Sequence, residues 1–263
     1  MLHNVKYNWC LLLMTMCLLT ACQQASKEDK KDDNPPTTAL SIPTFNADSA
    51  FAFVEKQVSF GPRVVNTEAH VNCGDWLAGK FREFGANVIE QRAELTAYTG
   101  ETLNARNIIA SYAPDKKRRV LLCAHWDSRH VADYDPDVSK RENPILGADD
   151  GGSGVAVLLE IARQLQDNPM DYMGVDLILF DAEDHGQPSD GGGFPQMQDS
   201  WCLGSQYWGK NPHVNGYNAN FGILLDMVGS KNARFTKDGT SSRITTALGF
   251  LPDLLYDVIG KSS

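Results

Sequence analysis

The amino-acid sequence predicts an α/β fold, with a central mixed, largely parallel β-sheet and helices on both faces. Three runs have apolar centres that face both ways, as strands buried on both faces do: RRVLLCAHWDS (118–128), GVDLILFDAED (174–184) and NFGILLDMVG (220–229). Between the first two lies GADDGGSGVAVLLEIARQLQ (147–166), whose apolar residues recur at helical spacing. Strands that alternate with helices indicate a sheet covered on both sides.

The earlier elements follow from the same periodicities. Apolar residues at helical spacing predict helices within 49–63 and 73–86, which end at a Gly-Pro pair and at Gly85. The stretches 87–95 and 104–113 predict strands. For the helix within 147–166, the Gly-Asp-Ser start predicts a turn and an N-cap.

The N-terminal stretch predicts a lipoprotein signal in residues 1–21. Its apolar run, WCLLLMTMCLLTA, is short and is followed at once by polar residues, which is typical of a secretory signal rather than a membrane span. The run ends in LTAC, which resembles the bacterial lipobox and implies lipidation of Cys22. Residues 22–44 are polar and contain proline, which predicts a disordered tether, and 45–263 form the folded domain. We therefore expect a lipid-anchored protein of the bacterial cell envelope, on the periplasmic face or at the outer membrane.

Charge and cysteine content exclude some functions. With a net charge of -9 and a pI near 5.1, the 263-residue chain does not suit nucleic acid as a partner. Three cysteines remain in the folded part, Cys73, Cys123 and Cys202, and one disulfide plus a free thiol is possible. Their irregular spacing argues against a zinc-thiolate cluster.

Acidic residues and one histidine follow the predicted strands. They are His125 with Asp127, Asp149 with Asp150, Glu183 with Asp184, and Asp226. In open α/β sheets, ligands bind beyond the carboxyl ends of the strands, so these side chains are expected along one edge. Imidazole nitrogen and carboxylate oxygen are donors that zinc accepts, and a spare carboxylate beside the metal suits proton transfer.

The motifs HWDS, GADDGGSGVAVLLEIAR, LILFDAED and ILLDMVG, in this order, resemble the zinc-dependent M28-type aminopeptidases and the related glutaminyl cyclases, most closely the bacterial cyclase-like lipoproteins. The resemblance covers about 48–230 and implies a zinc exopeptidase-like fold with zinc as the cofactor. By position, it implies that Asp150 and Asp184 bind metal and that Glu183 is the general acid/base.

The two branches of this family imply different roles for the same residues. In the peptidases, His125 and Asp226 would hold a second metal, and Asp127 would orient the imidazole. In the cyclases, one zinc would be bound by Asp150, Asp184 and a late histidine, while Asp226 would join a catalytic hydrogen-bond network.

Three features favour the cyclase branch. The loop after Asp184 is long, and FGPR (60–63) is similar to bacterial cyclase-like proteins. The loop region also supplies Trp201 and Trp208, for which a substrate pocket and core packing remain alternatives. The resemblance assigns no ligand role to His130 or His185, and loop histidines of this kind are expected to be solvated.

One departure affects the function. The sequence has no histidine after Asp226, and the familiar pattern ends near Asn232, so the domain is expected to be atypical or truncated beyond that point. The leading hypothesis is a glutaminyl-peptide cyclotransferase, which converts N-terminal glutamine of peptides or proteins to pyroglutamate and releases ammonia. The alternatives are a zinc-dependent aminopeptidase, and an inactive binding or envelope protein. The expected partners are peptide N-termini and, through the lipid anchor, a membrane.

Overall fold

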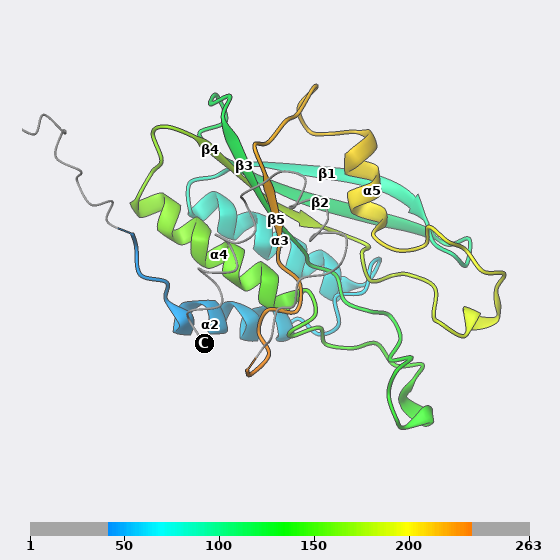
Figure 1. Cartoon of the computed structure of the whole chain (residues 1–263). Coiled ribbons are helices and arrows are strands. Elements are labelled where there is room, and N and C mark those ends of the chain that lie inside the picture. Colours follow the sequence, from blue (N-terminus) through cyan, green and yellow to red (C-terminus); the bar gives the residue numbers. More distant parts are fainter. Residues whose placement is uncertain (1–41, 233–263) are drawn as a thin grey trace, which may run out of the picture. The chain divides into compact units, whose positions relative to one another are not determined.

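The computed structural model describes residues 42–232 (Figure 1). The predicted signal, Cys22, most of the tether and the atypical end beyond 232 lie outside the described residues. Within 42–232, none of the helices combines the length and the apolar character needed to cross a membrane.

The sheet has five strands in the order β1-β2-β4-β3-β5. Their bounds are β1 Asn87–Thr96, β2 Thr102–Tyr112, β3 Arg119–His125, β4 Gly174–Phe180 and β5 Gly222–Leu224. The strands β1, β2 and β4 pair antiparallel, whereas β3 pairs parallel with both β4 and β5. This confirms the predicted mixed sheet, and it brings the carboxyl ends of β3, β4 and β5 to one edge.

Helices lie on both faces of the sheet, as predicted. Figure 1 shows α2 (Ala47–Val58), α3 (Glu68–Glu83) and α4 (Gly152–Asp167) on one side and α5 (Leu203–Lys210) on the other. Alternation along the strands explains this, because successive side chains point to opposite faces. Ile108 packs with Phe81 and Leu158 of the helices on the first face, whereas the next residue, Ile109, belongs to the cluster on the second face.

The predicted turn and N-cap precede α4. The N-cap is Gly151, with φ 78° and no side-chain capping hydrogen bond. A Cβ at this position would lie 2.9 Å from the Asp127 carbonyl oxygen and 3.0 Å from Cε1 of His125. Glycine therefore lets the start of α4 approach the end of β3. Ser153 instead donates its hydroxyl to the carbonyl of Asp149, at 2.6 Å.

Candidate active site

Three residues from separate elements converge at the carboxyl edge of the sheet. His125 ends β3, Asp150 precedes α4, and Asp226 follows β5. The His125 Nε2 atom lies 2.9 Å from Asp150 Oδ1 and 3.5 Å from Asp226 Oδ1. One donor atom from each residue lies within 4.8 Å of the other two. An imidazole and two carboxylates at this spacing form a group that can hold a divalent cation.

Asp127 contacts the Nδ1 side of the His125 imidazole. Its side chain is fully buried, and its Oδ1 lies 3.5 Å from His125 Nδ1. Burial lowers the pKa of His125, but interactions with Asp127, Asp150 and Asp226 outweigh it and raise the pKa above its ordinary range. Burial likewise raises the pKa of Asp127, but the interaction with His125 and hydrogen bonds from the backbone N–H groups of Asp184 and Glu183 bring it below the usual value. Asp127 is therefore a fixed negative charge.

The same carboxylate also holds the turn after β4. Asp127 accepts hydrogen bonds from the backbone N–H of Glu183, at 3.1 Å, and of Asp184, at 3.0 Å. In this turn Ala182 has φ 50°, a conformation that costs free energy for a residue with a Cβ. One buried side chain thus fixes both the imidazole and the two acids of the turn.

A buried pair beneath the turn was missed from the sequence. His70 Nε2 lies 2.9 Å from Asp181 Oδ2, and the His70 ring stacks on Trp126 at 4.4 Å. Asp181 also accepts hydrogen bonds from the backbone N–H groups of Arg106, at 2.6 Å, and Ala182, at 2.8 Å. Asp181 belongs to the FDAED stretch, but its partner precedes it by 111 residues, and no local pattern announces that contact.

Glu183 lies beside the His125 group but is not part of it. Its Oε2 is 3.9 Å from His125 Nδ1, and its Oε1 accepts a hydrogen bond from the thiol of Cys202 at 3.1 Å. Burial raises the pKa of Glu183, and the nearby His125 opposes this shift. A half-buried carboxyl with a raised pKa suits both taking up and releasing a proton.

Asp184 is buried and incompletely paired. Only 4% of its surface is exposed, and its Oδ2 has no hydrogen-bond partner among the described residues. Burial, followed by the charges of Asp150 and Asp127, raises the pKa of Asp184 to about 8. An unpaired buried carboxylate is costly, and a cation would offset the repulsion between these acids. Asp184 is therefore a candidate ligand, although the group of closely spaced donors consists of His125, Asp150 and Asp226, and the metal-binding role that the resemblance implies for Asp184 stays a prediction.

Arg129 was also missed. Its guanidinium donates two hydrogen bonds to Asp133, both at 2.7 Å, and one to the carbonyl of Asp184 at 3.2 Å. The guanidinium also lies over the ring of Trp201, 4.4 Å from its centroid. The arginine thus connects the candidate ligand Asp184 to the aromatic residue predicted for the pocket.

The two predicted pocket tryptophans occupy different surroundings. Trp201 lines a cavity in the loop after β4. Trp208 lies in α5, packs against Phe180 at 5.8 Å and donates to His213 Nδ1 at 3.1 Å. The contacts of Trp208 are those of a packing residue, and its pocket role stays a prediction.

His185 is not solvated, contrary to the prediction. Only 6% of its surface is exposed, and its ring stacks on that of His130 at 4.2 Å and 14°. His130 in turn contacts the hydroxyl of Tyr98 at 3.1 Å. This stacking joins the loop after β4 to the loop after β3, a long-range contact that no local pattern indicates.

Arg63, the last residue of FGPR, anchors the loop that leads to Asp150. Its buried guanidinium donates to the carbonyls of Trp126, at 2.9 Å, and of Leu146 and Gly147, both at 2.6 Å. Cys73, Cys123 and Cys202 are all free thiols in the described part of the chain, so the disulfide left open by the sequence is not formed among them.

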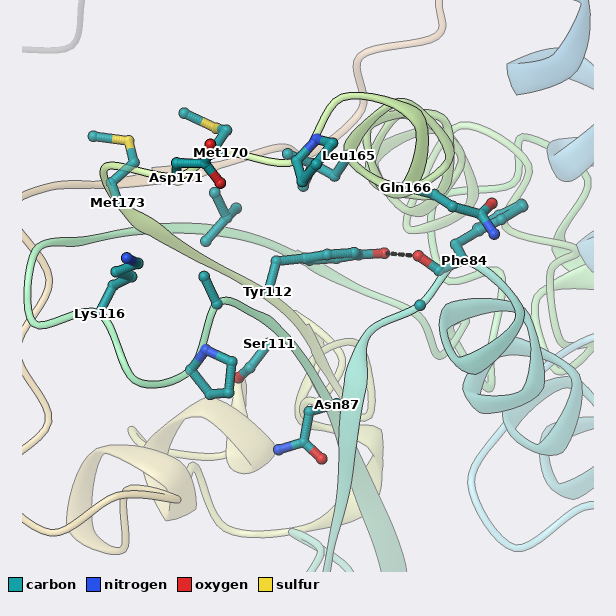
Figure 2. A pocket seen from close by; sticks show the side chains of 15 residues that line it. Phe84, Asn87, Ser111, Tyr112, Lys116, Leu165, Gln166, Met170, Asp171 and Met173 are labelled. Carbon is teal, nitrogen blue, oxygen red and sulfur yellow. Dashed lines mark hydrogen bonds between the residues drawn. The ribbon is translucent and has the colours of Figure 1, made fainter.

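A separate cavity of about 380 Å³ lies at the opposite end of the strands (Figure 2). Tyr112, the last residue of β2, projects into it and donates its hydroxyl to the carbonyl of Phe84 at 3.2 Å. Val175, near the start of β4, also lines it. This cavity is therefore remote from the acids that follow β4.

Comparison with known proteins identifies related sequences. The chain is 28% identical over 182 residues to glutaminyl-peptide cyclotransferase of Drosophila melanogaster, a match that covers 66% of this chain and 46% of that protein. It is 22% identical over 196 residues to the alkaline phosphatase isozyme conversion protein of Escherichia coli, covering 71% and 52%. The chain thus spans about half the length of these curated relatives.

Solved structures are more similar. A Zn-dependent exopeptidase from Parabacteroides distasonis is 56% identical, with a TM-score of 0.76, over 79% of this chain and 70% of that chain. The glutaminyl cyclase of Tannerella forsythia is 57% identical, with a TM-score of 0.74, over 78% and 70%. That of Bacteroides thetaiotaomicron, bound to N-acetylhistamine, is 53% identical, with a TM-score of 0.74, over 79% and 70%.

The family model of peptidase family M28 matches residues 107–251. The match continues beyond Asn232, so the family pattern extends further than the sequence motifs indicated. It confirms the resemblance found in those motifs. The chain belongs to peptidase family M28.

Proposed function

We propose that this protein is a glutaminyl-peptide cyclotransferase, which closes the N-terminal glutamine of peptides to pyroglutamate. The observation that carries the proposal is the position of Glu183. Its half-buried carboxyl lies beside the His125 group and accepts a hydrogen bond from Cys202, the residue directly after Trp201. A proton-transfer group is thus held by the residue that follows Trp201, whose ring packs on Gly186 and on the guanidinium of Arg129. The high identity to structures named glutaminyl cyclases supports this choice.

The donor set of the site fits zinc. In the cyclase, Asp150 and the unpaired oxygen of Asp184 would hold the zinc, whereas His125, Asp150 and Asp226 form the peptidase-type group of an imidazole and two carboxylates. Zinc, when bound, would polarise the carbonyl of the substrate γ-amide.

The remaining chemistry belongs to the side chains. The substrate α-amine forms a bond to the amide carbon as the bond to the amide nitrogen breaks. Glu183 accepts the proton that the amine loses and delivers it to the departing nitrogen, which leaves as ammonia. The main cause that keeps the pKa of Asp226 below its usual value is its interaction with His125. Asp226 therefore remains an anion during this transfer.

Turnover assays test the proposal. The purified protein, with and without added zinc, is incubated with a Gln-initiated peptide and with a leucyl chromogenic amide. Ammonia release that depends on Glu183 supports the cyclase. Amide hydrolysis without ammonia release from the Gln-initiated peptide would overturn it.

An aminopeptidase is the second candidate. The grouping of His125, Asp150 and Asp226 favours it, because the sequence resemblance assigns these residues to the second metal of the peptidases. In that reaction Glu183 would take a proton from water rather than from an amine. If zinc-loaded protein forms neither product, the third alternative, a non-enzymatic envelope protein, is the one that stands.

We also propose that the protein is anchored in the cell envelope by a lipid on Cys22. The LTAC sequence supports this location. Metabolic labelling with a fatty-acid analogue, compared between the wild type and Cys22→Ala, tests it, and equal labelling would contradict it.

A further inference from the structure

The loop between β4 and α5 lines an open cavity of about 650 Å³. One side is formed by Tyr134, from the loop after β3, and the rest by residues of 187–201. The side chains used in the argument below are Gln187, Asp190, Gln198 and Trp201.

Trp201 joins this cavity to the candidate active site. Its indole packs directly on Gly186, where any Cβ would overlap the ring, and under the guanidinium of Arg129. Gly186 is two residues after Asp184, and Cys202 contacts the Glu183 carboxyl. A peptide that places its N-terminus at Glu183 therefore has Trp201, and the cavity it lines, next to it.

The cavity is formed by an ordered loop. The buried side chain of Gln187 donates to the carbonyls of Gly191, Phe194 and Pro195, at 3.0 to 3.3 Å. Its oxygen accepts a hydrogen bond from the Met197 backbone N–H at 2.8 Å. These hydrogen bonds of one side-chain amide fix the loop that lines the cavity. A ligand would therefore bind to a surface that is largely preorganised.

The lining suits a peptide main chain. Glutamine, serine and backbone groups both donate and accept hydrogen bonds, as the peptide unit does. Asp190 is the charged residue in the lining, so an acidic side chain would be repelled there.

We propose that this cavity is a subsite that binds the peptide substrate from its third residue onward, and that it disfavours acidic residues. The proposal rests on the proposed function, since it adds a substrate preference to the same site. It predicts that longer peptides gain affinity from this loop and that a dipeptide does not.

The test compares a Gln-Ala amide with Gln-initiated hexapeptides that carry alanine or glutamate at the third position. Gln198→Trp places a bulky side chain in the cavity, and Gln166→Trp, on α4 beside the cavity of Figure 2, is the matched control. We expect Gln198→Trp to lower kcat/KM for the alanine hexapeptide about tenfold, through KM, and to leave the dipeptide within about twofold. An equal effect on both substrates, or none on the hexapeptide, would overturn the subsite.

A second variant tests the charge. Asp190 accepts a hydrogen bond from the Gly192 backbone N–H at 2.9 Å, which asparagine can also accept, so Asp190→Asn keeps the loop. The measured quantity is the ratio of kcat/KM for the hexapeptide with alanine at the third position to kcat/KM for the one with glutamate. We expect Asp190→Asn to lower this ratio about threefold, a small effect because the interaction is between exposed charges. An unchanged preference would contradict the assigned role.

Failure of the proposed function gives a different result. If the zinc-loaded wild type converts neither the dipeptide nor the hexapeptide, the cyclase assignment fails, and binding of a fluorescent alanine hexapeptide decides the subsite. Weaker binding to Gln198→Trp than to Gln166→Trp supports it. Equal binding, or no binding to the wild type, overturns it.

Discussion

Two buried aspartates at the two ends of β4 differ in their hydrogen-bond partners. Asp176, near the start of the strand, is fully buried and accepts hydrogen bonds from Arg119 at 2.6 and 2.7 Å, Ser111 at 2.6 Å and Tyr217 at 2.8 Å. Asp184, just after the strand, keeps an oxygen without a partner among the described residues. Arg119 neutralises Asp176 at close range, whereas Asp184 has a longer contact, of its Oδ1 with Arg129 Nη1 at 3.5 Å, and its Oδ2 can still bind a cation. The carboxylate with a full set of hydrogen bonds, Asp176, stabilises the fold, and the one with an unpaired oxygen, Asp184, lies at the candidate active site.

The largest effect is expected from Glu183→Gln. It removes the proton-transfer group but keeps a side chain of the same size. We expect kcat to fall by about 10² to 10⁴-fold, with the free energy of unfolding within about 0.5 kcal/mol of the wild type. Steady-state kinetics and urea unfolding measure the two quantities, and full activity would remove Glu183 from the mechanism.

Arg119→Met should give the opposite pattern. It removes the cation from Asp176 and leaves a buried unpaired charge, so we expect a loss of about 3 to 5 kcal/mol in the free energy of unfolding. Urea unfolding measures it, and exposed Arg92→Met serves as the control. A loss below about 1 kcal/mol would mean that Asp176 is not held as the structure indicates.

Zinc that binds to the acids after β4 should raise the free energy of unfolding of the protein. At a zinc concentration about 100 times Kd, we expect a gain of about 2.7 kcal/mol, seen as a rise in Tm. Asp150→Ala should abolish this rise, and chelation should reverse it in the wild type. Retention of the full rise in Asp150→Ala would exclude Asp150 as a ligand.

Replacement by asparagine should change the free energy of unfolding in opposite directions at Asp184 and Asp176. Without metal, at pH 9, Asp184→Asn removes a buried charge that has one long contact with Arg129, at 3.5 Å, and an Oδ2 without a partner among the described residues, so we expect it to stabilise the fold by about 1 to 3 kcal/mol. Asp176→Asn, which breaks a paired charge, is expected to destabilise it. Chemical unfolding of both variants in the presence of a chelator measures this, and two changes of equal sign would refute the comparison.

The smallest effect concerns pH. Burial raises the pKa of Asp176, but hydrogen bonds from Arg119, Ser111 and Tyr217 outweigh it and hold the pKa below its ordinary value. The stability from this group is therefore complete above the unfolded pKa, near about 3.9, and is lost as pH falls through the folded value. A tenfold difference between the acid dissociation constants of the folded and unfolded states corresponds to about 1.4 kcal/mol. The difference in unfolding free energy between wild type and Asp176→Asn should shrink between about pH 5 and pH 2, and a constant difference would contradict it.

Sequence patterns predicted the strands and the acids that follow them, because apolar periodicity is local. They failed where a role depends on distant partners. The predicted N-cap of α4 is present, but the reason that Gly151 occupies it, the close approach to His125 and Asp127, depends on another segment of the chain. His185 was expected in solvent, yet it stacks on His130 from another loop.

The sequence by itself determined the fold class, the edge of the sheet at which the acids gather, and the identity of Glu183 and Asp184 as the residues of interest. Only the tertiary structure decided how they are held: Asp127 binds both His125 and the turn, Arg129 connects Asp184 to Trp201, and Asp181 pairs with His70. The physical reason is that periodicity and turn preferences act over a few residues. Burial and hydrogen-bond partners depend on chain segments that meet only after folding.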